Sequence, residues 1–159
     1  MDLVGPGPVA PHFDDAVAAV RGLSASGRWA DLGSGAGFPG IALAATFGEA
    51  EVVLVERRQK RAAFLRAVVH EAQLDNASVL QDAADSLPGA GFDGVISRAY
   101  KPPEAYLGDC ARLLRPGGIA VVLTAGSWPP APAGFVCVSA QQYTIEGKPR
   151  AAARYCKSP

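Results

Sequence analysis

The segment 31–37, which has the sequence Asp-Leu-Gly-Ser-Gly-Ala-Gly, contains the residue types best suited to holding a small ligand. Its glycines allow the backbone to turn sharply and to approach a ligand without an obstructing Cβ. The segment follows an apolar run and precedes a helical pattern, so amides at the start of that helix would face the same ligand. We therefore predict a ligand-binding loop that uses Gly33, Ser34, Gly35 and Gly37. A purely structural glycine turn is the alternative.

Two acidic residues near this loop indicate what kind of ligand it binds. Asp31 stands just before Gly33, where a carboxylate can reach a cationic or amine-bearing group. Glu56 ends the next apolar run, about 20 residues after Gly37, where an acid can accept hydrogen bonds from both hydroxyls of a ribose. The two acids and the loop together predict a nucleoside-containing ligand.

A dinucleotide is the nearest competing ligand. A pyrophosphate site prefers the pattern G-x-G-x-x-G, and Phe38 occupies the position of its third glycine. An acid ahead of the loop also suits a sulfonium amino acid better than a pyrophosphate. The residues therefore predict S-adenosylmethionine as the cofactor, with another nucleotide as the alternative. Phe38 is included among the expected cofactor contacts.

Asp82 and Ala83 follow the third apolar run of the chain. In this architecture that position often contacts adenine, so we expect Asp82 to accept from the adenine amine and Ala83 to lie against the ring. A loop carboxylate without any partner is the alternative for Asp82.

The elements that must position these residues follow from hydrophobic periodicity. Short apolar runs alternate with helical patterns, which predicts parallel strands joined by crossover helices. The expected strands are 28–33, 51–56, 77–81, 92–97 and 118–123, and the expected helices are 39–47, 59–72 and 104–114.

After residue 123 the pattern changes. A Pro-rich loop over 126–134 leads to two β-like runs, 135–142 and 151–157, with no helical pattern between them. The predicted fold class is therefore α/β, a Rossmann-like class I methyltransferase domain with a mostly parallel sheet and a C-terminal antiparallel hairpin. We expect a single domain over 1–159, in which 1–27 form an N-terminal stub ahead of the first strand.

Composition narrows the class of protein. Apolar residues make up 49% and charged residues 19% of the 159, as in globular domains. The formal net charge is zero, which does not favour a wholly basic nucleic-acid-binding surface. The three cysteines are widely spaced, without a disulfide framework or metal-ligand spacing, and the first residues lack the features of a signal peptide. We expect a cytoplasmic monomer that binds no metal and enters no membrane.

Further motifs are more specific than the glycine loop. Gly-Phe-Pro-Gly-Ile occupies 37–41, Lys60-Arg61 stand ahead of Phe64-Leu65, and Ser-Arg-Ala occupies 97–99. With the loop, these motifs resemble the bacterial small-subunit ribosomal RNA methyltransferase G family, also called glucose-inhibited division protein B, over roughly 11–126. The resemblance implies methylation of N7 of a guanine in 16S ribosomal RNA, with that RNA or the small ribosomal subunit as the partner. Thr124 stands where the family commonly has a lysine.

Ring-nitrogen methylation agrees with the residues found after the fourth strand. Guanine N7 presents a lone pair, so an in-line attack on a methyl group requires alignment and no general base. The sequence 97–100, Ser-Arg-Ala-Tyr, differs from the Asn/Asp-Pro-Pro-Tyr motif that orients exocyclic amines. Methylation of pyrimidine carbon five needs a cysteine nucleophile, whereas Cys110 falls on an apolar helix face and is predicted to be core.

Arg98 is the candidate catalytic residue, and it is also counted among the cofactor contacts. It closes the fourth strand at the edge of the sheet where α/β proteins bind ligands. A guanidinium there can hold guanine O6 or a phosphate while it leaves N7 available. The alternative is a salt bridge to Asp93 or Glu104.

A basic cluster follows the second strand, and Lys101 follows the fourth. We predict substrate contacts from Arg57, Arg58, Lys60, Arg61 and Lys101. A solvated helix face, with one arginine near the adenine, is the alternative. Two other functions also remain open: a methyltransferase acting on a small molecule or another nucleic acid, and a catalytically weak module that binds S-adenosylmethionine.

Overall fold

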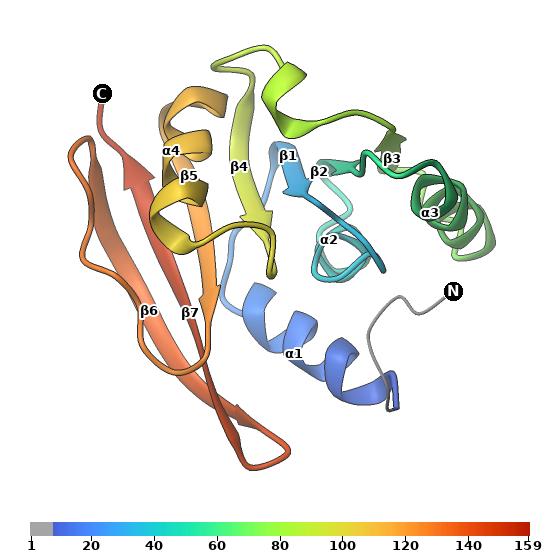
Figure 1. The fold of residues 1–159 in the computed structure, drawn as a ribbon, viewed down its shortest axis with the longest axis horizontal. Coiled ribbons are helices and arrows are strands. Elements are labelled where there is room, and N and C mark those ends of the chain that lie inside the picture. The colour runs from blue at the N-terminus through green and yellow to red at the C-terminus, as the bar shows by residue number, and fades with distance from the viewer. Residues whose placement is uncertain (1–7) are drawn as a thin grey trace.

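A computed structural model describes residues 8–159, so residues 1–7 of the predicted N-terminal stub lie outside the described residues. Residues 8–159 form a seven-stranded sheet in the order β3-β2-β1-β4-β5-β7-β6, with helices on both faces (Figure 1). The strands are β1 Gly27–Leu32, β2 Ala50–Val55, β3 Ala77–Leu80, β4 Phe92–Ser97, β5 Leu114–Thr124, β6 Phe135–Ile145 and β7 Lys148–Lys157. The helices are α1 Ala10–Val20, α2 Gly40–Thr46, α3 Gln59–Glu71 and α4 Pro103–Leu113, with a 3-10 turn η1 at Ala84–Ser86.

Strand pairing confirms the predicted fold class. β1 pairs in parallel with β2 and β4, and the parallel ladder continues to β3 on one side and β5 on the other. β7 then pairs antiparallel with both β5 and β6, so the C-terminal hairpin completes the sheet. The strand order reverses between β1 and β4, and ligands of open α/β sheets bind outside the carboxyl ends of the strands at such a point.

Successive side chains of the central strands point to opposite faces of the sheet, so a hydrophobic core forms on each face. Helices α1, α2 and α3 cover one face, where Val20, Leu43 and Leu65 pack on Trp29 and its neighbours. Helix α4 and the η1 turn cover the other face, together with alternate residues of β1, β2 and β4. Cys110 is fully buried in this second core, as its place on the apolar face of a helix predicts. In the described part of the chain, no helix has both the length and the apolar character needed to cross a membrane.

Helix α1 and the lengths of the last strands differ from the sequence-based expectation. Residues 1–27 were expected to form an N-terminal stub for which no helix was predicted, yet α1 runs from Ala10 to Val20 and buries Ala16, Ala19 and Val20. These small side chains at helical spacing form a narrow stripe that a search for bulky apolar residues does not detect. β5 also starts earlier than predicted, at Leu114.

The C-terminal hairpin is longer than predicted because its turn is very tight. Glu146 and Gly147, with φ of 48° and 74°, join β6 to β7 as a two-residue turn, which suits the twist of antiparallel strands. Near the other end of β6 the pairing register shifts between Cys137 and Ser139, leaving Val138 as an extra residue. This bulge lies on the outermost strand of the sheet.

Asn76 joins the end of α2 to the first residues of β2. Its amide nitrogen lies 3.0 Å from the carbonyl oxygen of Ala44, 3.1 Å from that of Phe47 and 3.0 Å from that of Ala50. Carbonyls at the end of a helix have no intrahelical partner, so Asn76 supplies a donor to the Ala44 carbonyl as well as to the carbonyls of Phe47 and Ala50. The connection holds α2 in line with the strand that follows it.

We expect Asn76→Ala to lower the free energy of unfolding by about 1–3 kcal/mol, because half-buried carbonyls lose their donor. Urea titration followed by circular dichroism measures this change. Asp75→Ala is the matched control, since Asp75 is the exposed neighbour. Equal losses in the two variants would contradict the assigned role of Asn76.

Candidate functional site

A cleft of about 760 Å³ opens where the carboxyl ends of β1, β4 and β5 converge. The loop after β1 lines it with Gly33, Ser34, Gly35, Ala36 and Phe38. The remaining walls include His12 and Asp15 from α1, Arg61 from α3, Arg98 after β4, Thr124 from β5, and Tyr143, Lys148 and Arg150 from the β6–β7 hairpin. The structure therefore brings together three strand ends, two helices and one hairpin that lie far apart in the sequence.

The loop glycines serve two different purposes. All three have positive φ, and a Cβ on Gly33 would lie 2.7 Å from Cδ2 of Tyr100, so Gly33 is needed for packing. A Cβ on Gly37 would similarly lie 2.6 Å from Cγ1 of Ile41. Gly35 differs, because the nearest atom to its Cβ position is 3.6 Å away and the residue lines the cleft. Gly35 is therefore the loop glycine that packing does not require, and it borders the cleft directly.

Asp31 lies beneath the loop and organises it. Its Oδ2 accepts hydrogen bonds from the Ser34 hydroxyl at 2.6 Å and from the Gly40 amide at 3.0 Å. Burial raises the pKa of this carboxyl to about 6, an effect that the two hydrogen bonds and the charge of Arg98 only partly offset. Among the described residues, Oδ1 of Asp31 has no hydrogen-bond partner although it is buried. Direct contact between Asp31 and a bound amine remains a prediction.

Glu56 holds the loop from the adjacent strand. The side chain is 4% exposed and follows β2 directly. Its Oε2 accepts from the Gly35 amide at 3.1 Å and its Oε1 from the Arg58 amide at 2.8 Å. Each carboxylate oxygen accepts more than one hydrogen bond, so Glu56 keeps capacity for the hydroxyls of a ligand.

Arg98 is held at the end of β4 by a partner that the sequence analysis did not consider. Its Nη1 donates to Oδ2 of Asp15 at 3.3 Å, and its guanidinium carbon lies 5.7 Å from the centre of the Phe38 ring. The expected alternative, a salt bridge to Asp93 or Glu104, is wrong for Asp93, which instead pairs with Arg115. Ser97, the last residue of β4, donates to the Leu32 carbonyl at 2.7 Å and so joins the ends of β4 and β1.

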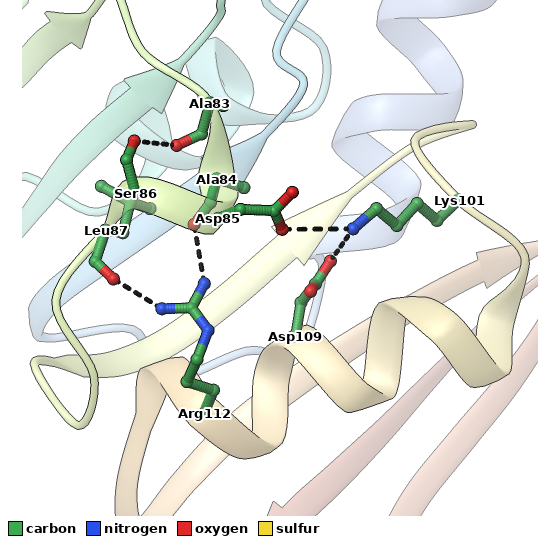
Figure 2. A network of polar contacts seen from close by, with 8 residues as sticks. All are labelled: Ala83, Ala84, Asp85, Ser86, Leu87, Lys101, Asp109 and Arg112. Atoms are coloured by element: carbon green, nitrogen blue, oxygen red, sulfur yellow. Dashed lines mark hydrogen bonds and ion pairs between the residues drawn. The ribbon is translucent and has the colours of Figure 1, made fainter.

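The turn after β3 carries Asp82 and Ala83 but does not line the cleft. The Ser86 hydroxyl and the Ala83 amide lower the pKa of the exposed Asp82 carboxyl. Figure 2 shows how α4 holds this turn: Arg112 donates to the carbonyls of Ala84 at 2.7 Å and Leu87 at 2.5 Å. The two residues expected at the adenine are therefore on a fixed turn beside the cleft.

Lys101 belongs to the same network of polar contacts. Its Nζ lies 2.8 Å from Oδ2 of Asp109 and 3.5 Å from Oδ1 of Asp85 (Figure 2). The hydrogen bond to Asp109 holds the pKa of Lys101 above its ordinary value. The predicted substrate contact is thus engaged by two carboxylates, and it does not line the cleft.

The basic cluster divides between cleft and surface. Arg61 lines the cleft, with its guanidinium near Gly35, whereas Arg57, Arg58 and Lys60 are exposed outside it. The buried side of α3 is formed by Ala62 and Leu65. Within residues 8–159, no three His, Cys, Asp or Glu side chains are grouped so that they could hold a metal ion.

Sequence reasoning missed the contribution of Asp15 and of the hairpin to the cleft. Asp15 was not singled out, and Tyr143, Lys148 and Arg150 fell between the two predicted β-like runs, 135–142 and 151–157, where they were given no role. A signal exists in hindsight: Tyr143 and Arg150 face each other in the register that a two-residue turn at Glu146 dictates. Locating that turn would have brought both side chains to the same end of the sheet.

The raised pKa of Asp31 has a consequence for stability. The folded protein holds the proton more tightly than the unfolded chain, so this group contributes stability that is present below its ordinary pKa of 3.8 and lost as the pH rises through about 6. We expect the free energy of unfolding of the wild type to fall by up to about 3 kcal/mol, relative to Asp31→Asn, across this range. Chemical denaturation of both proteins at a series of pH values measures the difference. If the free energy of unfolding changed with pH in the same way in both proteins, the raised pKa of the buried Asp31 carboxyl would be contradicted.

Comparisons with known proteins agree with this geometry. The model of the family described as rRNA small subunit methyltransferase G matches residues 8–129, which include all five parallel strands and the glycine loop. A ribosomal RNA small subunit methyltransferase G of Sodalis glossinidius is 47% identical over 89 residues, covering 55% of this chain and 43% of the relative. The protein of the same name from Pseudomonas syringae is 39% identical over 101 residues, covering 63% and 47%. The matched region therefore spans less than half the length of these relatives.

Solved structures support the fold. A predicted O-methyltransferase from Agrobacterium tumefaciens superposes with a TM-score of 0.72 at 24% identity, covering 91% of this chain and 80% of that one. TYW2 of Pyrococcus horikoshii, solved in complex with MeSAdo, gives a TM-score of 0.74 at 15% identity over 98% of this chain and 66% of its own. The family match covers most of the chain and confirms the family indicated by the motifs at 37–41 and 97–99. The chain belongs to the rRNA small subunit methyltransferase G family.

Proposed function

We propose that this protein is an S-adenosylmethionine-dependent methyltransferase that modifies N7 of a guanine in 16S ribosomal RNA. The observation that carries the proposal is the cleft at the carboxyl end of β1, which the glycine loop lines and where Glu56 accepts from the Gly35 amide. This is the position at which α/β proteins of this strand order bind nucleotide-containing ligands. Membership of the family supports the choice of reaction and substrate. A ribosomal substrate also supports the proposed cytoplasmic location.

The residues around Gly35 fit the proposed cofactor. Glu56 retains acceptor capacity for a ribose diol, and the buried Oδ1 of Asp31 is a carboxylate oxygen that an ammonium group would satisfy. Gly33 and Ser34 both line the cleft. We propose that Gly37 gives the loop its shape. We also propose that Asp82 and Ala83 lie on the side of the site that receives the adenine. When bound, S-adenosylmethionine supplies a methyl group on a positively charged sulfur.

The proposed role of the protein is to hold guanine N7 in line with that methyl group. N7 carries a lone pair, so no side chain has to remove a proton, and alignment provides most of the rate enhancement. Arg98 and Phe38 line the same part of the cleft and form a cation–π pair, which gives a planar, positively charged wall. Arg98 would donate to guanine O6 or to a phosphate and leave N7 unobstructed.

The basic residues outside the cleft suit the RNA backbone. Arg57, Arg58 and Lys60 are exposed beside the cleft, where they would contact phosphates without reading the sequence. Arg61 lines the cleft and lies closer to the cofactor loop. Lys101, paired with two carboxylates, contributes less free charge than the sequence alone suggests.

The proposed ribose contact can be tested by comparing two ligands, adenosylhomocysteine and its 2′-deoxy analogue, in two proteins, the wild type and Glu56→Gln. We expect Glu56→Gln to weaken adenosylhomocysteine by about 10- to 100-fold, because a hydrogen bond to a charged group contributes about 1.5–3 kcal/mol. The 2′-deoxy analogue should bind the wild type more weakly, and this preference should shrink in Glu56→Gln, whose neutral amide oxygen is a weaker acceptor than a carboxylate. Isothermal titration calorimetry measures all four affinities.

Glu51→Gln is the control for the charge change, since Glu51 is exposed and lies on β2, the strand that Glu56 follows. A preference for the ribose hydroxyl that is undiminished in Glu56→Gln would show that Glu56 shapes the loop without contacting the diol.

Methyl transfer itself tests the substrate. We expect Arg98→Ala to reduce transfer to small ribosomal subunits about 100-fold, because a misaligned base reacts slowly, while the affinity for adenosylhomocysteine stays nearly constant. The assay uses tritiated S-adenosylmethionine and subunits from a strain that lacks the endogenous enzyme, with the modified base identified by mass spectrometry.

Label on guanine N7 is the expected result for the wild type. Label on another base would contradict the proposed substrate. Tight binding of the cofactor without any methyl transfer would contradict the proposed enzymatic activity. It would favour a module that only binds S-adenosylmethionine.

A further inference from the structure

Asp15 is the point at which three separate segments of the chain meet at the cleft. Its side chain is largely buried on α1. Oδ2 lies 3.3 Å from Nη1 of Arg98, which follows β4, and Oδ1 accepts from the hydroxyl of Tyr143, on β6, at 2.9 Å. In Figure 1, α1 runs beside the lower part of the β6–β7 hairpin. One carboxylate therefore contacts both the arginine proposed for substrate binding and the hairpin wall of the same cleft.

The surroundings of Arg98 leave its guanidinium little freedom. Asp15 binds it on one side and the Phe38 ring lies 5.7 Å away. The Arg98 side chain is 22% exposed and that of Asp15 is 10% exposed, so solvent screens this pair less than a surface ion pair. Within residues 8–159, the hydrogen bond from Arg98 to the protein uses Nη1, which leaves Nη2 and Nε as donors for a substrate.

A second contact connects α1 to the hairpin independently. Nε2 of Gln141 donates to the carbonyl oxygen of Ala18 at 2.8 Å. With the bond from Tyr143 to Asp15, α1 and β6 are joined at two points along the helix. The hairpin tip, which carries Lys148 and Arg150 into the cleft wall, is thereby held at a defined position relative to Arg98.

We propose that Asp15 is a positioning residue: it orients the Arg98 guanidinium toward the substrate and, through Tyr143, holds the β6–β7 hairpin as the facing wall of the cleft. This inference rests on the proposed function, in which Arg98 contacts the base or a phosphate. The physical basis is preorganisation. A long arginine side chain gains precision when a buried carboxylate removes its other rotamers before the substrate arrives.

The test compares two adjacent acids of the same helix. Asp15→Asn keeps the size of the side chain and removes its charge, whereas Asp14→Asn removes the same charge from an exposed position. We expect Asp15→Asn to lower kcat for methyl transfer by about 10- to 100-fold, with the KM for S-adenosylmethionine unchanged. Asp14→Asn should match the wild type.

A double variant separates positioning from a general loss of structure. If Asp15 acts mainly through Arg98, Asp15→Asn in an Arg98→Ala background should cost no more than the small loss that Tyr143→Phe causes in that background. Tyr143→Phe breaks only the bond to the hairpin, so it should leave the Arg98 pair intact and cause a smaller loss. Additive losses, or a fall in the melting temperature that accounts for the lost rate, would overturn the inference.

A readout without substrate keeps this inference distinct from the proposed function. In NMR spectra of the protein with adenosylhomocysteine, rotation about the Arg98 Nε–Cζ bond should be slow in the wild type, Asp14→Asn and Tyr143→Phe, and fast in Asp15→Asn. Slow rotation that persists in Asp15→Asn would overturn the positioning role. A wild-type protein that shows slow rotation but transfers no methyl group would instead refute the proposed function and leave the Asp15–Arg98 coupling standing.

Discussion

The site depends on one buried carboxylate oxygen, Oδ2 of Asp31, which joins a strand, a loop and a helix. It accepts from the Ser34 hydroxyl within the loop and from the amide of Gly40, the first residue of α2. A Cβ on Gly40 would lie 2.6 Å from this oxygen, so the contact requires glycine there. Glu56 repeats the arrangement from the next strand by accepting from the amides of Gly35 and Arg58. Buried carboxylates are tolerated because backbone donors compensate them, and those donors give the loop its shape.

Much of the fold follows from local patterns in the sequence. The strands β1, β2 and β4 are short runs whose last four residues are buried on both faces of the sheet, and these runs were located to within a residue. Helix α1 was missed because its buried stripe consists of alanines and one valine, whose pattern is weak in isolation. The long hairpin was underestimated because β6 is mostly exposed, so only tertiary pairing with β7 makes it regular.

The candidate site was predicted where its chemistry is local and missed where it depends on the fold. Gly35 and Glu56 are close through one strand–loop–helix unit, and spacing alone indicates their association. Asp15 and Tyr143 are separated by most of the chain, and only the sheet order brings them to the same carboxyl edge. Lys101 shows the opposite error: it is basic and near the site in sequence, but the acids of η1 and α4 engage it. Counting charges cannot reveal which cations already have partners.

The bulge in β6 has a consequence for contact between molecules. Among residues 8–159, β6 is the last strand of the sheet and its outer edge pairs with no other strand, while Val136 and Val138 are 58% and 55% exposed there. A flat, apolar edge of this kind is a template for β-augmentation, the start of many aggregates. The register shift between Cys137 and Ser139 interrupts the regular spacing of donors and acceptors at these two valines. An incoming strand therefore cannot form a continuous ladder there, and the opposite edge, β3, is only 4 residues long.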